Sequence, residues 1–311
     1  MKKRYLFSLF VGLFLCALLS VLSLTKTDIY GQSSEVSAIA GKTEFAAPKS
    51  AVKKTNSVLP ANLMTAANEN RILKNNLAWT FGAKAQRGWY IYVPLIQQTI
   101  GTEADAETPE FAQAVSFWQS KFGLTSSGRL DSETLMKMVE FWQSRRLKSN
   151  RYPSEGELLT APISNFYDPS RPAELLQVER ETYEAYKKMV AAAAKDLKLK
   201  TDANGELAPD EQFLRIVSSF RSREYQEKLR RASPHSGSAG LAVNSPHFTG
   251  RALDIYVGGE PTITKDPNRA LQSQTPAYKW LVKNAERFGF YPYYYEPWHW
   301  EYVPNRNREI K

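Results

Sequence analysis

The sequence predicts an α+β fold, in which helices pack on a small antiparallel sheet, together with a separate small all-α domain of three helices. Short β-branched and aromatic stretches at 213–220, 251–257 and 298–303 alternate with longer stretches of helical periodicity. Residues 93–142 contain only helical stripes, which are broken by turn residues. At 311 residues, the chain is long enough for two compact domains and an N-terminal extension.

The first 24 residues have the pattern of an export segment. Basic side chains at 2–4 precede an apolar run at 5–24, which is the order found in secretory signals. This run is long for a signal core and nearly long enough to span a bilayer, so residues 1–24 are either a cleaved signal peptide or a retained membrane anchor. We therefore expect an exported protein in the periplasm or cell envelope, which contacts the membrane if this segment is not removed.

Residues 25–76 have the composition of a flexible tether, rich in Ser, Thr, Ala, Lys and Asn and poor in aromatic residues. The net charge of +9 is concentrated in residues 1–80, which carry ten Lys and Arg against four acids. This distribution suits contact with anionic surface polymers, and we expect no nucleic-acid partner. The single cysteine, Cys16, lies in the export segment, so disulfides and thiolate metal ligands are not expected once that segment is removed.

Three helices are expected in the next part of the chain. Thr108-Pro109 predicts a helix start, because threonine caps a helix and proline suits its first turn. Apolar residues then follow helical spacing until Gly123. A second helix begins at Asp131 or Ser132, and an earlier one at 93–100 completes the group. Their apolar stripes are more typical of a core than of a ligand surface.

The second half of the chain, residues 160–311, is expected to form the α+β domain. Residues 172–195 have the apolar spacing of a long amphipathic helix. Shorter helices are expected at 222–232 and 276–288, alternating with the three strands named above. This alternation gives an antiparallel sheet with helices packed on it.

Two histidines and an aspartate form a candidate metal site in this half. Asp254 and His299 lie on predicted strands, with side chains on the polar face of each strand, so both can project into a common cleft. His247 lies in the loop that leads into the first of these strands. Two imidazoles and one carboxylate are the number of ligands that a catalytic zinc takes when a fourth position stays open. The nearby Glu296 is then the natural proton carrier.

A single loop histidine is more often a surface or core residue than a metal ligand, but this chain has only three histidines and two fall in one motif. The third, His235, lies in a similar Ser-Pro-His sequence. Seven residues after His247 comes Asp254, whereas seven residues after His235 comes Ala242. We therefore expect His235 not to be a ligand.

Glu301 competes with Glu296 for the role of general base, because it shares a strand face with His299. Two residues along a strand correspond to about 6.5–7 Å, which is far for a group that must reach the same water. We therefore favour Glu296. No serine or cysteine nucleophile system is a serious alternative, since the histidines are already used as ligands.

These residues resemble the motifs of the VanY-type D-alanyl-D-alanine carboxypeptidases, within a wider group of zinc peptidases that includes lysostaphin and the hedgehog N-terminal domain. The resemblance covers residues 162–303, about half of the chain. It is carried by Ser219-Phe220-Arg221-Ser222, by Ser245-x-His247 with Gly250 and Asp254, by Trp280-Leu281-x-x-Asn284-Ala285-x-x-Phe288-Gly289-Phe290, and by Glu296-Pro297-Trp298-His299.

The resemblance implies a role for each site residue. The implied zinc ligands are His247, Asp254 and His299. Glu296 would act as general base and then general acid. Arg221 would stabilise the carbonyl oxygen of the substrate, and Ser245 would contact the substrate. Without the resemblance, Arg221 would be interpreted as a surface charge at the end of a strand.

A second resemblance covers part of the helical region. Residues 114–134, with Trp118-Gln119, Phe122-Gly123-Leu124, Gly128 and Leu130-Asp131, resemble the small three-helix peptidoglycan-binding domain. This implies that residues 77–150 bind the cell wall, with a purely structural helical module as the alternative. Individual glycan contacts are not assigned.

The favoured function is an exported zinc D,D-carboxypeptidase that removes the terminal D-alanine of peptidoglycan stem peptides. One alternative is an endopeptidase that cuts an L,D or cross-bridge bond, since the sequence does not show the pocket shape that decides between them. Another is a non-catalytic wall-binding module that contains zinc. The presence of Glu296 and Arg221 beside all three ligands argues against the last alternative.

Overall fold

The computed structural model describes residues 61–82, 84–149, 151–232 and 244–304. All of these residues belong to one compact unit. Among those residues, no helix is long and apolar enough to cross a membrane. The expected export segment at 1–24 and most of the expected tether lie outside the described part of the chain.

The three helices expected in the first part of the chain are confirmed. They are α2 (Val93–Ile100), α3 (Pro109–Lys121) and α4 (Ser132–Ser144). The Thr108 hydroxyl caps α3 by accepting a hydrogen bond from the Phe111 N–H, at 3.3 Å. Asp131 caps α4 in the same way, accepting from the Thr134 N–H at 3.0 Å. Each of the two helix starts is therefore set by its own capping residue.

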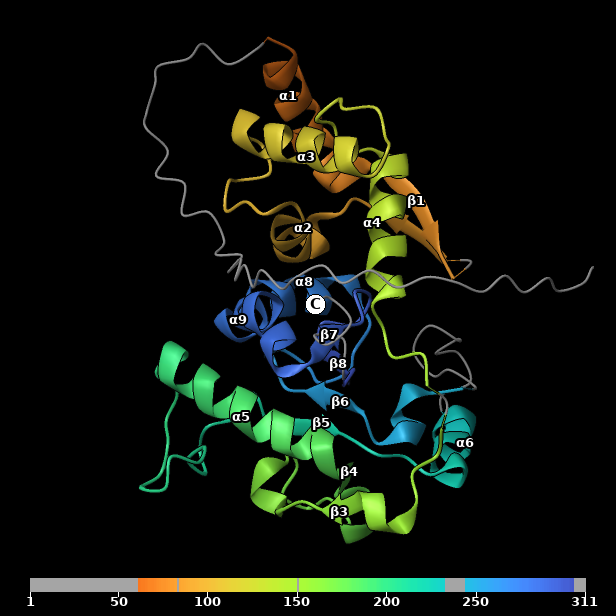
Figure 1. Cartoon of the computed structure of the whole chain (residues 1–311), viewed down its shortest axis with the longest axis vertical. Helices are drawn as coiled ribbons and strands as arrows, with labels where there is room; N and C mark the ends of the chain where they lie inside the picture. The colour runs from red at the N-terminus through yellow and green to blue at the C-terminus, as the bar shows by residue number, and fades with distance from the viewer. Residues whose placement is uncertain (1–60, 83, 150, 233–243, 305–311) are drawn as a thin grey trace, which may run out of the picture. The chain divides into compact units, whose positions relative to one another are not determined.

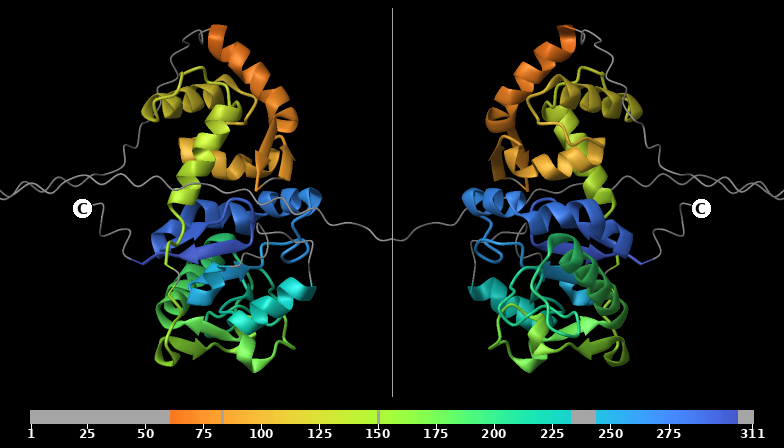
Figure 2. Two further views of the ribbon diagram at one scale, coloured as in Figure 1. Left: turned by 90° about the vertical axis from the view of Figure 1, so that its right-hand side faces the viewer. Right: turned by 90° about the vertical axis from the view of Figure 1, so that its left-hand side faces the viewer.

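Two further elements of this region were not expected. A hairpin is formed by β1 (Ala78–Phe81) and β2 (Lys84–Arg87). The tether prediction is wrong for its last sixteen residues, because α1 (Ala61–Asn76) is a helix that packs on α3 (Figures 1 and 2). The side chain of Asn70 is fully buried and bonds both the Gly128 carbonyl and the Leu130 N–H. This long-range pairing has no local sequence signal.

The second half of the described chain has the predicted α+β class. Its four-stranded antiparallel sheet has the order β5-β6-β8-β7. The strands are β5 (Ile216–Ser218), β6 (Ala252–Ile255), β7 (Phe290–Pro292) and β8 (His299–Tyr302). The helices are α5 (Arg180–Leu197), α6 (Arg223–Ala232), α8 (Asp266–Gln274) and α9 (Pro276–Asn284). Of these elements, α8 and β7 were not expected.

The helix expected at 172–195 begins later than predicted. A short 3-10 turn at Ala173–Leu175 is followed by β4 (Gln177–Glu179), which pairs with β3 (Leu158–Thr160), and only then by α5. The Glu179 carboxylate caps α5 by accepting from the Thr182 N–H at 2.8 Å. The residues just before Glu179 therefore form a strand and not the first turns of the helix. Their pairing partner, β3, lies elsewhere in the sequence.

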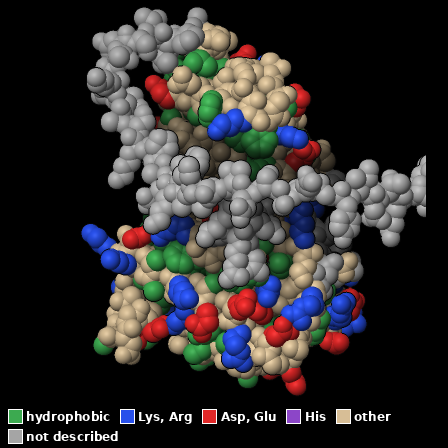
Figure 3. All heavy atoms as spheres, viewed as in Figure 1, with side chains coloured by type: hydrophobic (Ala, Val, Ile, Leu, Met, Phe, Trp, Pro, Cys, Tyr) green, Lys and Arg blue, Asp and Glu red, His purple; other side chains and the backbone are tan. Residues whose placement is uncertain are grey.

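A single cluster of buried apolar side chains runs through both the helical and the α+β regions. The rings of Trp142 on α4 and Tyr294 before β8 lie 5.6 Å apart in this cluster. The division into domains at 77–150 and 160–311 stays a prediction. Because the two regions share this core, packing between α4 and the residues around the sheet stabilises both. On the face drawn in Figure 3, acidic and basic side chains lie intermixed.

Candidate active site

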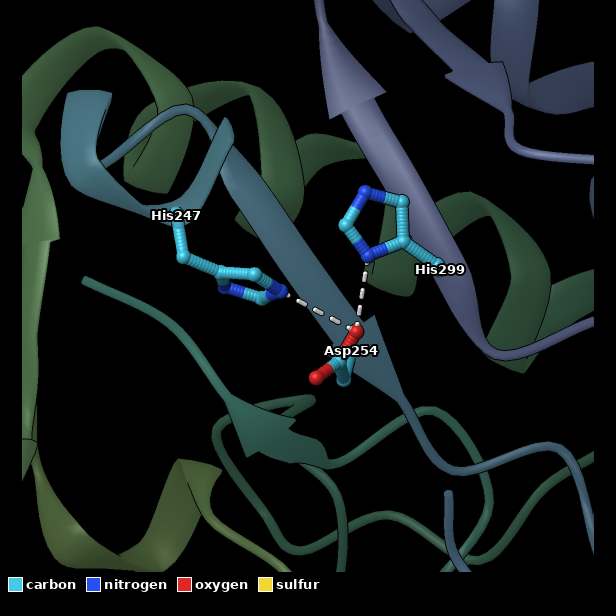
Figure 4. A group of neighbouring side chains, drawn as sticks. All are labelled: His247, Asp254 and His299. Atoms are coloured by element: carbon cyan, nitrogen blue, oxygen red, sulfur yellow. Dashed lines mark hydrogen bonds and ion pairs between the residues drawn. The ribbon is translucent and has the colours of Figure 1, made fainter. Parts of the chain in front are cut away.

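The three predicted metal ligands come together at the middle of the sheet. Asp254 on β6 and His299 on β8 are directly opposite each other in the antiparallel register. His247 comes from a 3-10 turn, Pro246–Thr249, just before β6. The ligand atoms of the three side chains lie within 4.8 Å of one another, and all three residues are buried (Figure 4). The predicted convergence of the three ligands is therefore seen in the structure.

The turn that carries His247 is held by its own residues. The Ser245 hydroxyl accepts a hydrogen bond from the His247 N–H at 3.3 Å. Gly250 ends the turn with a φ of +69°, in the left-handed region that favours glycine. A Cβ at this position would lie 2.9 Å from the Cβ of Glu179. The Gly250 of the sequence motif is thus needed to bring the turn back into β6.

Each histidine has one ring nitrogen held by a group outside the three candidate ligands, which decides the nitrogen that is left for a metal. Nδ1 of His247 donates to the Ser219 carbonyl oxygen at 2.7 Å, so Nε2 is its free ligand atom. Nε2 of His299 donates to Oε1 of Glu301 at 3.1 Å, so Nδ1 is the ligand atom there. The two histidines therefore present opposite ring nitrogens to the same point.

The charges around this point fit a bound cation. Burial, together with the Arg221 charge, lowers the pKa of His247 to about 4, so this ring is neutral at pH 7. Its Nε2 lone pair then faces Oδ1 of Asp254 at 3.3 Å. Two buried acceptors that face each other repel unless a cation lies between them. Two imidazoles and a carboxylate are also a donor set that zinc prefers.

The Asp254 carboxylate is ionised despite its burial. Burial opposes ionisation, but in the acidic range where Asp254 would take up a proton His247 is itself protonated, and its charge, the Arg221 charge and the hydrogen bonds from both histidines hold the pKa of Asp254 well below its usual range. Nη2 of Arg221 donates to Oδ2 of Asp254 at 2.6 Å, and Nε donates to the Ser218 hydroxyl at 2.9 Å. Arg221 is therefore a buried part of the site and not a surface charge.

His299 differs from His247 because carboxylates lie on both sides of its ring. Burial alone would lower its pKa, but hydrogen bonds to Asp254 and Glu301 raise the pKa of His299 to about 9. Nδ1 of His299 donates to Oδ1 of Asp254 at 2.9 Å. This proton must leave before His299 can bind a metal, since a histidine ligand is neutral.

Glu296 is a buried carboxyl group beside these charges. Its main-chain carbonyl accepts from the His299 N–H at 2.9 Å, which fixes the tight bend before β8. Burial, with a further contribution from Asp254, raises the pKa of Glu296 to about 8, although the positive charges of His299, Arg221 and Arg146 oppose this shift. A carboxyl group with a pKa near neutrality is suited to accept and return a proton.

Glu301, the other candidate base, has a different environment. It is fully buried and accepts hydrogen bonds from Nε of Arg146 at 3.0 Å and from the Leu147 N–H at 2.8 Å, as well as from His299. Burial opposes ionisation, but the bond from His299 and the charges of His299 and Arg146 lower the pKa of Glu301 to about 2. A carboxylate so stabilised is a poor base, which supports the choice of Glu296.

Sequence reasoning missed Arg146 and Leu147, which contact the site through Glu301. They lie 155 and 154 residues before it, just after α4. Arg146 is one of two consecutive arginines at a helix end, where a basic residue is common, so its sequence carries no functional signal. His235 lies outside the described residues. Substrate contact by Ser245 stays a prediction.

The site has the composition of a hydrolase centre, and comparison with known proteins agrees. Residues 175–305 match the family model of VanY, described as D-alanyl-D-alanine carboxypeptidase. This confirms the resemblance for that part of the chain and supports a hydrolase of carboxypeptidase type.

No curated protein matches the chain. Among solved structures, the chain is similar to the LdcB LD-carboxypeptidase, whose structure is described as revealing the molecular basis of peptidoglycan recognition. The identity is 23%, the match covers 52% of this chain and 74% of that chain, and the TM-score is 0.37.

Proposed function

We propose that this protein is a zinc-dependent D,D-carboxypeptidase that hydrolyses the terminal D-Ala-D-Ala bond of peptidoglycan stem peptides. One observation carries the proposal. His247, Asp254 and His299 converge on one buried point, beside a carboxyl group whose pKa is raised towards neutrality. The VanY match over residues 175–305 supports the choice of substrate.

The residues of the chain divide the chemistry among them. Zinc held by His247, Asp254 and His299 would supply Lewis acidity, which activates water and polarises a carbonyl group. Glu296 accepts a proton from the attacking water and returns it to the leaving amine, so that one carboxyl group serves as base and then as acid. Its burial keeps its pKa close to the pH at which both steps must occur.

Arg221 meets the negative charge that develops on the carbonyl oxygen. Its guanidinium has five N–H donors, so the three described hydrogen bonds, to Ser218, Gln226 and Asp254, leave donors for the substrate. The bond to Asp254 also holds the group in place before substrate arrives, and a preorganised donor costs little at the moment of reaction. Ser245, at the start of the His247 turn, is proposed to contact the substrate.

We also propose that the protein is exported and acts in the periplasm or cell envelope. The basic and apolar pattern at 1–24 supports this proposal, with the segment either cleaved or kept as an anchor. Wall binding by residues 77–150 belongs to the same proposal and is supported by the sequence pattern around α3 and α4.

The test is mass spectrometry of muropeptides incubated with the zinc-loaded full chain. Pentapeptides ending in D-Ala-D-Ala should lose one D-alanine, and a chelator should stop the release. Tetrapeptides, which end in an L,D bond, should remain intact. Cleavage of tetrapeptides only, or release of longer fragments, would replace the proposal with an L,D-specific or endopeptidase activity. No cleavage of any muropeptide would favour a non-catalytic wall-binding protein.

A further inference from the structure

We propose that Glu301 and Arg146 are positioning residues of the metal centre, in which Glu301 orients the ring of His299 and Arg146 holds Glu301. The inference rests on the proposed function in one respect only, namely that His299 is a zinc ligand. It assigns a role in metal binding to a segment outside the carboxypeptidase match, because Arg146 lies well before residue 175.

The first link is the contact between Glu301 and His299. The two residues share one face of β8, and Oε1 of Glu301 lies 3.1 Å from Nε2 of His299. This contact leaves Nδ1 of His299 to face Asp254. A carboxylate that accepts from the second nitrogen of a metal-binding histidine fixes the tautomer and the ring orientation, and it makes the ring a stronger ligand.

The second link is the pair of donors that stabilise Glu301. Its side chain is fully buried, and a buried carboxylate is costly unless hydrogen bonds and an opposite charge compensate it. Arg146 donates to Oε1 through both Nε and Nη2, and the Leu147 N–H donates to Oε2 at 2.8 Å. Both carboxylate oxygens are therefore held by the segment that follows α4.

The Arg146 side chain is itself fixed in place. Its guanidinium lies over the ring of Tyr293, with 4.0 Å between Cζ and the ring centroid. The Tyr293 ring in turn meets the His299 ring edge-on, with 5.9 Å between centroids. Arg146 thus contacts both Glu301 and Tyr293, the two residues that pack against the predicted metal ligand His299. Only 23% of the Arg146 side chain is exposed.

The neighbouring Arg145 offers a matched control. It has the same side chain and lies at the same helix end, but it pairs with the half-exposed Glu286 on the surface. A variant of Arg145 removes one positive charge, the ion pair with Glu286 and the contacts of its guanidinium with the rings of Phe141 and Tyr291, whereas the described hydrogen bonds of Glu301 come from other residues. Any general effect of charge or of α4 stability on zinc binding should therefore be equal in the two arginine variants.

The electrostatics predict an order of effects. Glu301→Gln removes a negative charge next to His299 and leaves the Arg146 charge unbalanced, so both changes disfavour a cation at the ligand point. Arg146→Ala leaves the carboxylate in place but releases it from its fixed position. The loss of zinc affinity should therefore be larger for Glu301→Gln than for Arg146→Ala, and absent for Arg145→Ala.

The experiment measures the zinc dissociation constant of the full chain by competition with a chromophoric chelator. We expect Glu301→Gln to weaken zinc binding by about 10- to 100-fold, as for other partners of metal-binding histidines. Arg146→Ala should weaken it by a smaller factor, and Arg146→Lys, which restores one charged donor, should recover part of the loss. The absorption spectrum of the cobalt-loaded protein should change in the same variants and not in Arg145→Ala.

The double variant Glu301→Gln with Arg146→Ala separates positioning from a general structural effect. If Arg146 acts through Glu301, the double variant should bind zinc no more weakly than Glu301→Gln alone. Additive losses, or equal zinc affinity of Arg146→Ala and Arg145→Ala, would overturn the inference. If Glu301→Gln does not fold, the zinc affinities of Arg146→Ala, Arg146→Lys and Arg145→Ala still test the inference.

Failure of the inference is distinguishable from failure of the proposed function. If the unchanged chain binds zinc but cleaves no muropeptide, the proposed function fails and the affinity comparison still stands. If the unchanged chain binds no zinc, both fail, because His299 is then not a ligand. Loss of turnover in Glu301→Gln at saturating zinc, without a change in KM, would support the positioning role.

Discussion

Replacing Glu296 by glutamine keeps the size of the side chain and removes its ability to take up a proton. Turnover should fall by about 10² to 10⁴, the usual contribution of a positioned general base. Zinc stoichiometry should not change, because Glu296 is not one of the three ligands. These two results together separate the general base from the metal ligands.

The same substitution should stabilise the metal-free protein at high pH. Burial raises the pKa of Glu296 from 4.5 to about 8, so between these values the folded chain binds more protons than the unfolded chain. Stability is then lost as pH rises through this range. At about 1.4 kcal/mol per pKa unit, ionised Glu296 costs up to about 5 kcal/mol at pH 9, and glutamine avoids this cost.

The assay is urea unfolding of chelator-treated protein at pH 4.5 and pH 9, with kinetics and zinc content measured on the loaded protein. Glu301→Gln is a control of opposite sign, because the pKa of Glu301 is lowered to about 2 and its ionised form stabilises the fold. Equal stability changes for Glu296→Gln at the two pH values would refute the reasoning on burial. Unchanged turnover would refute the role of Glu296 as base.

Four further predictions concern the substrate contact, the metal, a helix cap and the choice of histidines. Arg221→Lys keeps the charge but loses the forked geometry, so kcat should fall about 10²- to 10³-fold, and an unchanged kcat would exclude contact with the oxyanion. Zinc binding at pH 7 should release about one proton, because the effect of burial is outweighed by hydrogen bonds to Asp254 and Glu301, which raise the pKa of His299 to about 9, and calorimetry in buffers of different ionisation enthalpy would detect it. Apparent zinc affinity should accordingly fall as the pH is lowered. Thr108→Ala should cost about 1 kcal/mol of stability through the lost cap, with zinc content unchanged. His235→Ala should leave zinc stoichiometry unchanged, whereas His247→Ala should lose the metal; the reverse result would show that the histidine set was wrongly chosen.

Much of the local structure could be predicted from sequence because its causes are local. The starts of α3 and α4 follow from Thr108 and Asp131, whose side chains satisfy N–H groups within the next few residues. The range of α2 was also predicted correctly, as the helix that completes the three-helix group, although no side chain caps its start. The start of α5 was wrong, because the preceding residues pair with β3, and a strand pairing depends on a partner elsewhere in the chain.

The convergence of His247, Asp254 and His299 on one candidate metal site could also be predicted from sequence. Asp254 and His299 lie in strands, where alternation decides the face of each side chain, and their motif spacing separates His247 from His235. The fold class, the grouping of these three side chains and the preference for Glu296 over Glu301 all have their basis in the sequence. Each of these conclusions depends on residue type and short-range spacing.

Only the tertiary structure decided how the two carboxyl groups differ. Glu296 and Glu301 are the same residue type, five positions apart, and both are buried. The pKa of Glu296 is raised by burial, whereas Glu301 meets His299, Arg146 and the Leu147 N–H, and its pKa is lowered. Two of these three partners come from a segment about 155 residues earlier in the chain. Sequence determines which groups can ionise, but their pKa values depend on neighbours that only the folded chain brings into contact.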